Sequence, residues 1–200
     1  YNYFNINKKK INIFHQMLFN FFNNYYFYRI VNICFILFHL INIKKYVSFH
    51  DFFYIQDKYI DWNKLYGKKG FIEFHILVPK KNAVNFLKKF FGFCSKNKVF
   101  SNLIVLKRLK SKKKNINFKG DGLSISCDFV INKNYNKIIN FYLENAKKYG
   151  YIFYFAKDQI VSKKNYKFDK EFYEFKKKIK FINKKNKINS LLSNRIGLTT

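Results

Sequence analysis

Proline, glycine and cysteine are all scarce in this chain of 200 residues, which has one proline, seven glycines and three cysteines. The cysteines, Cys34, Cys94 and Cys127, lie far apart and are odd in number, so neither a disulfide framework nor a cysteine-based metal site is indicated. They are interpreted either as thiols kept free in a reducing compartment or merely as buried thiols, and a cytoplasmic location is expected. The histidines show no spacing typical of zinc ligands, so no metal is expected. The glycines do not form a GxGxxG phosphate-binding loop.

Acidic residues are also scarce. The chain has 11 Asp and Glu against 40 Lys and Arg, which gives a formal net charge of +29. Nevertheless, 48% of the residues are hydrophobic and 22% aromatic, more than a disordered basic tail carries, so the chain is expected to fold. Lysines are spread along the whole chain without a zinc-finger or helix-turn-helix pattern. The overuse of Lys, Asn, Ile, Phe and Tyr is typical of an A/T-rich genome. Much of the charge is therefore compositional, and specific nucleic-acid binding is not expected.

Residues 1–46 form an apolar, Asn-rich N-terminal segment, and residues 47–198 are taken as the main domain. The most apolar stretch, 30–43, is shorter than the roughly 20 residues that a membrane-spanning helix needs. Extending it back to Tyr25 would place Arg29 inside the bilayer at a cost of about 2.5 to 3.5 kcal/mol. The stretch is therefore predicted to be buried in protein or to lie at a membrane interface. The chain does not begin with Met and has no signal-peptide pattern, and we interpret it as a fragment.

From residue 70 onward, strand and helix patterns alternate along the chain. Strands are predicted at 70–79, 101–109, 122–131 and 151–156, and helices at 82–97, with Asn82 as N-cap, and 134–149, with Gly150 as the stop. The order β-α-β-β-α-β predicts an α+β fold with a ferredoxin-like antiparallel sheet and two helices on one face. The other face is left for a partner or ligand.

The strand at 122–131 alternates between apolar and polar residues, as a sheet covered on one face requires. Ser124 and Ser126 fall on the polar side, and the face of 70–79 that carries His75 is also partly polar. A basic segment at 166–196 is predicted to add one or two helices. We assign the apolar stripe of this segment to packing rather than to a cofactor site. The stripe consists of Phe168, Phe172, Phe175 and Ile179.

Several motifs follow one another in a fixed order along this region. They are DWNKLYG at 61–67, Gly70-Phe71, LVP at 77–79, LIVLKRL at 103–109, GLSISCDFVI at 122–131 and YFAKD at 154–158. From about His50 to Leu198 the chain thereby resembles the C-terminal half of FAD-dependent sugar and lactone oxidases. The resemblance is to the decaprenylphosphoryl-β-D-ribose 2'-oxidase group and its relatives with a D-arabinono-1,4-lactone oxidase domain.

The resemblance implies a substrate or cap domain of a flavoprotein of the vanillyl-alcohol-oxidase type. FAD would be bound mainly by an N-terminal domain with a glycine-rich loop, which these residues do not include. The matched Lys157 and Tyr154 would lie at the flavin, and Lys107 matches a second active-site lysine. A cation there makes physical sense because the reduced flavin ring carries negative charge. Lys157 and Lys107 are the predicted catalytic residues.

Three departures from the family pattern leave the exact substrate open. His75 stands where the family commonly has glutamine, Ser124 and Ser126 stand where it has Asn and Cys, and Leu123 replaces a tryptophan. His75, Ser124 and Ser126 are predicted to position the substrate, although a histidine satisfied by its sheet neighbours is an equal alternative for His75.

The leading hypothesis is oxidation of a sugar-type secondary alcohol, either a polyprenyl-phosphate pentose at C2' or an aldonolactone. A short-chain reductase partner is implied by the resemblance, and peripheral attachment to an anionic membrane surface would suit the charge. Two alternatives remain open. One is a non-catalytic basic α+β module that binds nucleic acid or an anionic membrane surface. The other is a truncated gene product without activity.

Overall fold

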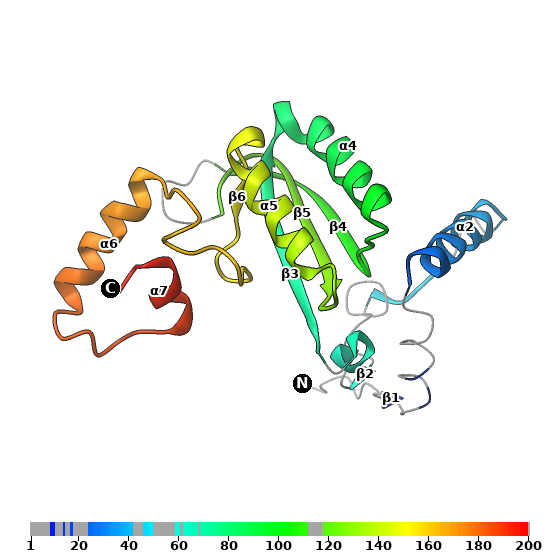
Figure 1. Ribbon diagram of the computed structural model, residues 1–200, viewed down its shortest axis with the longest axis horizontal. Coiled ribbons are helices and arrows are strands. Elements are labelled where there is room, and N and C mark those ends of the chain that lie inside the picture. Colours follow the sequence, from blue (N-terminus) through cyan, green and yellow to red (C-terminus); the bar gives the residue numbers. More distant parts are fainter. Residues whose placement is uncertain are drawn as a thin grey trace. The chain divides into compact units, whose positions relative to one another are not determined.

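The central element of the fold is a four-stranded sheet, shown with its helices in Figure 1. The computed structural model describes residues 9–10, 14, 17, 24–41, 46–49, 59–60, 62–67, 69–111 and 118–199. They fall into two units, Tyr1–Phe71 and Ile72–Thr200. The first unit holds β1 (Lys9–Lys10), α2 (Tyr25–Ile41), β2 (Tyr59–Ile60), which pairs in parallel with β1, and the short 3-10 helix η2 (Trp62–Tyr66).

The sheet belongs to the second unit, whose strands alternate with helices as the sequence predicts. Its elements are β3 (Phe71–Pro79), α4 (Lys80–Asn97), β4 (Leu103–Ser111), β5 (Gly120–Val130), α5 (Tyr135–Tyr149), β6 (Ile152–Phe153), α6 (Lys170–Ile182) and α7 (Leu191–Ile196). The antiparallel strands lie in the order β4-β5-β3-β6. This is the arrangement of a ferredoxin-like sheet, so the predicted fold class is confirmed.

One face of the sheet is covered by both α4 and α5 (Figure 1). Tyr142 of α5 stacks on Phe74 of β3 with ring centroids 4.2 Å apart. Phe90 of α4 meets Phe129 of β5 edge to face, at 6.3 Å. Because Phe129 also contacts Tyr142, the two helices pack on the same apolar face. The buried alternate residues of β3 and β5 form the core, namely Ile72, Phe74, Ile76, Val78, Ile125, Cys127 and Phe129.

Two predicted boundaries are wrong for identifiable reasons. Asn82 is not the N-cap of α4, because Pro79 ends β3 and the helix begins directly after it at Lys80. The Asn82 amide instead donates to the carbonyl of Tyr149, 2.8 Å away, and joins the start of α4 to the end of α5. The last strand covers only β6, not 151–156, because Tyr154 opens a turn in which its carbonyl accepts from the amides of Lys157 and Asp158.

The basic C-terminal segment forms two helices, α6 and α7, and its aromatic stripe serves packing at its start. Phe168 and Phe172 are buried and stack with ring centroids 4.0 Å apart. Phe172 belongs to the main core, so the beginning of α6 is attached to the sheet unit. Phe175 and Ile179, further along the stripe, are only half-buried.

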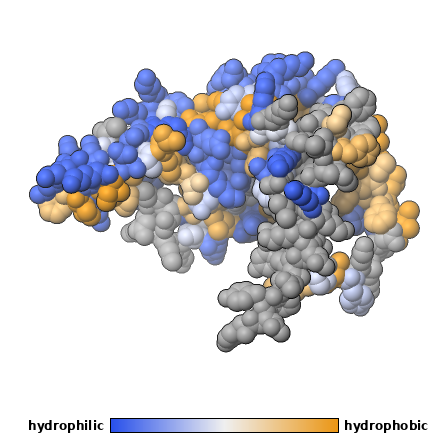
Figure 2. Space-filling view, turned by 90° about the horizontal axis from the view of Figure 1, so that it is seen from below, coloured by the Kyte–Doolittle hydropathy of each residue, from blue (hydrophilic) through white to orange (hydrophobic). Residues whose placement is uncertain are grey.

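Residues 30–41 of the apolar stretch lie in α2, which has no buried residue, so they are not buried among the described residues, and a position at a membrane interface stays a prediction. Its hydrophobic side chains lie at the surface, toward the right of Figure 2. Ile36 and Phe38, for example, are 58% and 55% exposed. Among the described residues, no helix is both long and apolar enough to cross a membrane.

A glycine marks the closest approach of the two central strands and gives a test of the sheet order. A Cβ atom on Gly122 of β5 would lie 2.1 Å from the carbonyl oxygen of Val78 in β3. We therefore expect Gly122→Ala to destabilise the fold by about 3 kcal/mol, because the backbone of β3 must shift to admit the methyl group. Urea denaturation measures this difference.

Gly92→Ala is the matched control. Gly92 lies inside α4, and a Cβ there meets no atom within 4 Å. The substitution should stabilise the protein by about 0.5 to 1 kcal/mol through helix propensity. Equal unfolding midpoints for the two variants would contradict the pairing of β5 with β3.

Candidate functional site

Polar side chains gather on the face of the sheet that α4 and α5 leave open. The register of β4 and β5 sets Lys107 opposite Ser124, so these two residues share this face with Ser126. The open-face site, as we call it, consists of Glu73, His75, Lys107, Ser124, Ser126, Tyr154 and Lys157. It contains all six residues that the sequence predicted, and it adds Glu73.

Glu73 is the acidic centre of the open-face site. Its Oε1 atom lies 2.9 Å from the Lys157 Nζ and accepts a hydrogen bond from the Ser126 hydroxyl at 2.5 Å. The Glu73 side chain is only 20% exposed, whereas that of Lys157 is 48% exposed. Sequence reasoning missed Glu73, although a carboxylate in an otherwise apolar strand of an acid-poor chain was a usable signal.

His75 is held at one ring nitrogen only. Its Nε2 atom lies 2.8 Å from the Ser124 hydroxyl oxygen. Its Nδ1 atom is buried and has no hydrogen-bond partner in the part of the chain that the structure describes. The nearest carboxylate oxygen is Oε1 of Glu73, 3.8 Å away. The imidazole therefore has one unused polar atom beside an acid.

The charges around His75 favour its neutral form. Burial lowers the pKa of His75 below its ordinary 6.5, the Lys157 and Lys107 ammonium groups lower it further, and the Glu73 carboxylate opposes them. At neutral pH the ring is thus uncharged and able to accept a proton.

Two aromatic rings flank the imidazole. Phe118, which directly precedes β5, lies edge-on to His75 at 4.9 Å, and Tyr154 lies at 5.1 Å. The two rings are also in contact with each other, at 5.1 Å. Sequence reasoning found Tyr154 through its motif but not Phe118, whose neighbours in the sequence resemble no motif. The rings cover the histidine and give the site an apolar wall.

The position of Lys157 is set by a short turn attached to the sheet at His75. The amide of Tyr154 donates to the carbonyl of His75, 2.8 Å away. Three residues later the amide of Lys157 donates back to the carbonyl of Tyr154, at 3.0 Å. The backbone therefore returns Lys157 to the side of the strand that carries Glu73 and His75.

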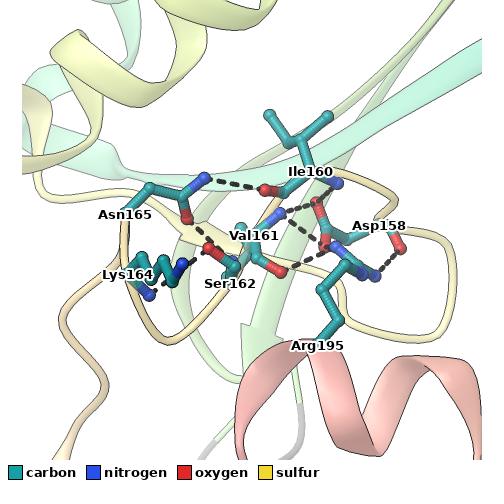
Figure 3. Close-up of polar contacts among 7 residues, drawn as sticks. All are labelled: Asp158, Ile160, Val161, Ser162, Lys164, Asn165 and Arg195. Atoms are coloured by element: carbon teal, nitrogen blue, oxygen red, sulfur yellow. Dashed lines mark hydrogen bonds and ion pairs between the residues drawn. The ribbon is translucent and has the colours of Figure 1, made fainter.

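The next residue, Asp158, is bonded to Arg195 and to the backbone that follows it, as Figure 3 shows. Its side chain is 2% exposed and forms a 2.7 Å ion pair with Arg195 of α7. The carboxylate also accepts from the amides of Ile160 and Val161, and Arg195 donates to the carbonyls of Asp158 and Val161. Sequence reasoning included Asp158 in its motif but did not find Arg195, which lies 37 positions away.

A separate hollow lies between α5 and residues 150–169 and is lined largely by aromatic and aliphatic side chains. None of the residues of the open-face site lines it. No group of three or more metal-ligating side chains is found among the described residues. Chemically, the open-face site offers two ammonium groups, one carboxylate and a neutral imidazole.

Comparisons with known proteins leave this geometry as the main guide to function. Neither the protein-family models nor the curated proteins give a match to the chain.

The Asp158–Arg195 pair predicts a stability effect that an exposed pair does not share. Arg195→Met should destabilise the protein by about 3 kcal/mol, because it leaves the buried Asp158 carboxylate without its counter-charge. Urea denaturation provides the measurement. Lys170→Met, which removes one partner of the exposed Lys170–Glu174 pair of α6, is the control and should change little. Similar losses in both variants would show that the pair does not anchor the turn.

Proposed function

We propose that this chain is the substrate-side domain of an FAD-dependent oxidoreductase that oxidises a sugar-type secondary alcohol. The observation that carries the proposal is the convergence of residues from four separate segments on one sheet face. His75, Lys107, the two serines and the Tyr154–Lys157 turn are far apart in the sequence and lie together at the open-face site. Three of these segments carry motifs of the resemblance.

The residues present fit the group that the resemblance implies. Bound FAD supplies the two-electron acceptor that takes hydride from the alcohol carbon. Lys157 extends an ammonium group that is half exposed, as a cation facing a negatively charged ring requires. The unpartnered Nδ1 of His75 and the aromatic wall beside it suit a flat, polar-edged ligand. FAD would be held mainly by a glycine-rich N-terminal domain.

The two serines have a more specific role in this proposal than direct substrate contact. The Ser124 hydroxyl is bonded to His75, and the Ser126 hydroxyl is bonded to Glu73. Both serines therefore orient the acid and the imidazole. The Lys157 side chain is more exposed than that of Glu73, and it is the group that contacts the ligand. The substrate is an aldonolactone or a polyprenyl-phosphate pentose, and a short-chain reductase would act as partner.

The alternative of a basic module that binds a polyanion is less well supported. A polyanion site needs cations without a competing acid, yet the Lys157 ammonium is paired with the Glu73 carboxylate. An acid in the centre of the site suits a ligand whose charge changes during a reaction.

We expect Lys157→Ala to slow flavin reduction by on the order of 10² to 10³-fold in the flavin-loaded protein. The reason is the loss of one preorganised cation at the position where negative charge develops. Anaerobic stopped-flow bleaching of the flavin, at saturating substrate, measures this step apart from reoxidation. The experiment uses the chain joined to a glycine-rich flavin-binding domain.

Lys110→Ala is the matched control. Lys110 is an exposed lysine near the end of β4, opposite Asp121, and its removal should leave the rate unchanged. Flavin reduction at the parent rate in Lys157→Ala would overturn the proposed role of the open-face site.

Attachment to an anionic membrane surface is part of the proposal and depends on α2. This helix of 17 residues exposes large hydrophobic side chains along its length, within a chain of net charge +29. Apolar residues around a whole helix are found where protein or lipid covers it. Anionic lipid is the occupant that the charge favours.

The double variant Ile33→Asp, Leu37→Asp should bind anionic phosphatidylglycerol vesicles at least about tenfold more weakly than the parent chain. The reason is that two apolar side chains no longer enter the lipid. Both side chains are 54% exposed in α2. Co-sedimentation with vesicles gives the affinity. Val84→Asp, at a position 62% exposed on α4, is the control for an apolar residue elsewhere. Unchanged binding of the α2 variant would show that the helix does not enter the lipid surface.

A further inference from the structure

The Glu73 carboxylate lies near two nitrogen groups, the Lys157 ammonium and the His75 imidazole, and is bonded to only the first of them. Its Oε1 atom is 2.9 Å from the Lys157 Nζ and 3.8 Å from the His75 Nδ1. The first distance is that of an ion pair with a hydrogen bond, and the second is too long for one. The His75 Nδ1 atom is buried and unpartnered among the described residues, which leaves a place for a proton and a carboxylate contact.

The bond from Glu73 to Lys157 is the easier one to exchange. The Lys157 side chain is long and 48% exposed, so its ion pair is weakened by solvent. His75, by contrast, is fixed by Ser124 and enclosed by Phe118 and Tyr154. An anion that takes the Lys157 ammonium would therefore leave the Glu73 carboxylate with Ser126 alone, and the nearby group that can supply a positive charge is His75.

We propose that Glu73 is a positioning residue that changes partners. It holds Lys157 while no anion is bound, and it turns to His75 when an anion takes the Lys157 ammonium, so that His75 gains a proton as the anion binds. The chemistry needed is a negative charge placed against Lys157. The identity of that anion rests on the proposed function, which offers the reduced flavin ring or a substrate phosphate.

The exchange would serve the proposed reaction because alcohol oxidation releases a proton. When the anion at Lys157 is the reduced flavin ring, the O–H bond of the alcohol would break with its proton going to His75, and the C–H bond would break with its electron pair leaving as hydride to the bound flavin. The alcohol is oxidised to a carbonyl by two electrons, and the acceptor is reduced by the same two. Negative charge at Lys157 and the proton at His75 would then appear together, linked by Glu73.

The sign of the expected change follows from the groups that face His75. These are Glu73 on its own strand, Lys107 on β4, and Lys157 and Tyr154 after β6. Burial and the two lysines lower the pKa of His75, and Glu73 raises it. Neutralising Lys157 removes one lowering influence and frees Glu73, so the pKa of His75 must rise.

The test is an NMR pH titration of His75 in the full 200-residue chain. The parent chain should titrate below 6.5. Lys157→Met, which imitates a neutralised lysine, should raise the pKa of His75 by about one pH unit, and Glu73→Gln in the same chain should make that rise clearly smaller, leaving the part due to the lost Lys157 charge itself. Lys110→Met is the control for removing a distant lysine. An unchanged titration in Lys157→Met, or a rise of the same size with and without Glu73, would overturn the proposal.

Two further arms identify the anion. Inorganic phosphate added to the chain without flavin should raise the pKa of His75 if the source is a substrate phosphate. Chemical reduction of the flavin-loaded protein, without substrate, should raise it if the source is the flavin ring. An unchanged pKa of His75 in both experiments would overturn the proposal. Its failure is distinct from that of the proposed function, because normal flavin reduction in Lys157→Ala tests the latter alone.

Discussion

The two-residue period of the central strand β3 is the constraint on which the other features depend. Ile72, Phe74 and Ile76 point into the core, and the residues between them, Glu73 and His75, therefore point to the open face. A shift of register by one residue would put these two polar side chains into the core. The packing of Tyr142 of α5 on Phe74 thus fixes the orientation of the site on the opposite side of the sheet.

In the open-face site, the hydrogen-bond partners are divided unequally between the Glu73 carboxylate and the His75 imidazole. Glu73 is mostly withdrawn from water, which is costly for a carboxylate unless counter-charges and hydrogen bonds replace the water. Lys157 and Ser126 supply that replacement at a single oxygen. His75 is nearby but uses only Nε2. A buried polar atom without a partner costs free energy, so the unpartnered Nδ1 of His75 is the weak point of this network.

The sequence predicts the fold and six of the seven residues of the site, and what it misses shares a physical cause. Period-two alternation in 122–131 and motif order identified the strands and the two lysines. Glu73, Phe118 and Arg195 were missed because their importance comes from contacts across the fold: the first pairs with Lys157 and the last with Asp158. Such pairings depend on sheet order and helix placement, and neither leaves a local pattern. Asn82 fits an N-cap pattern, but the neighbouring Pro79 determined where the helix begins.

In a chain with 40 basic residues, the position of a single lysine carries little information, but the 11 acids carry more. Asp158 is buried against Arg195, and Asp169 caps α6 by accepting from the amide of Phe172. Asp128 is buried within β5, and Glu73 of β3 is partly buried, with its carboxylate bonded to Lys157 and Ser126. Compositional drift toward lysine adds charge at the surface without choosing a place for it, whereas a withdrawn carboxylate costs free energy at one defined position. Among the described residues, Lys157 and Ser126 offset that cost through their bonds to Glu73, so this acid, more than the abundant lysines, is the residue from which the open-face site can be located.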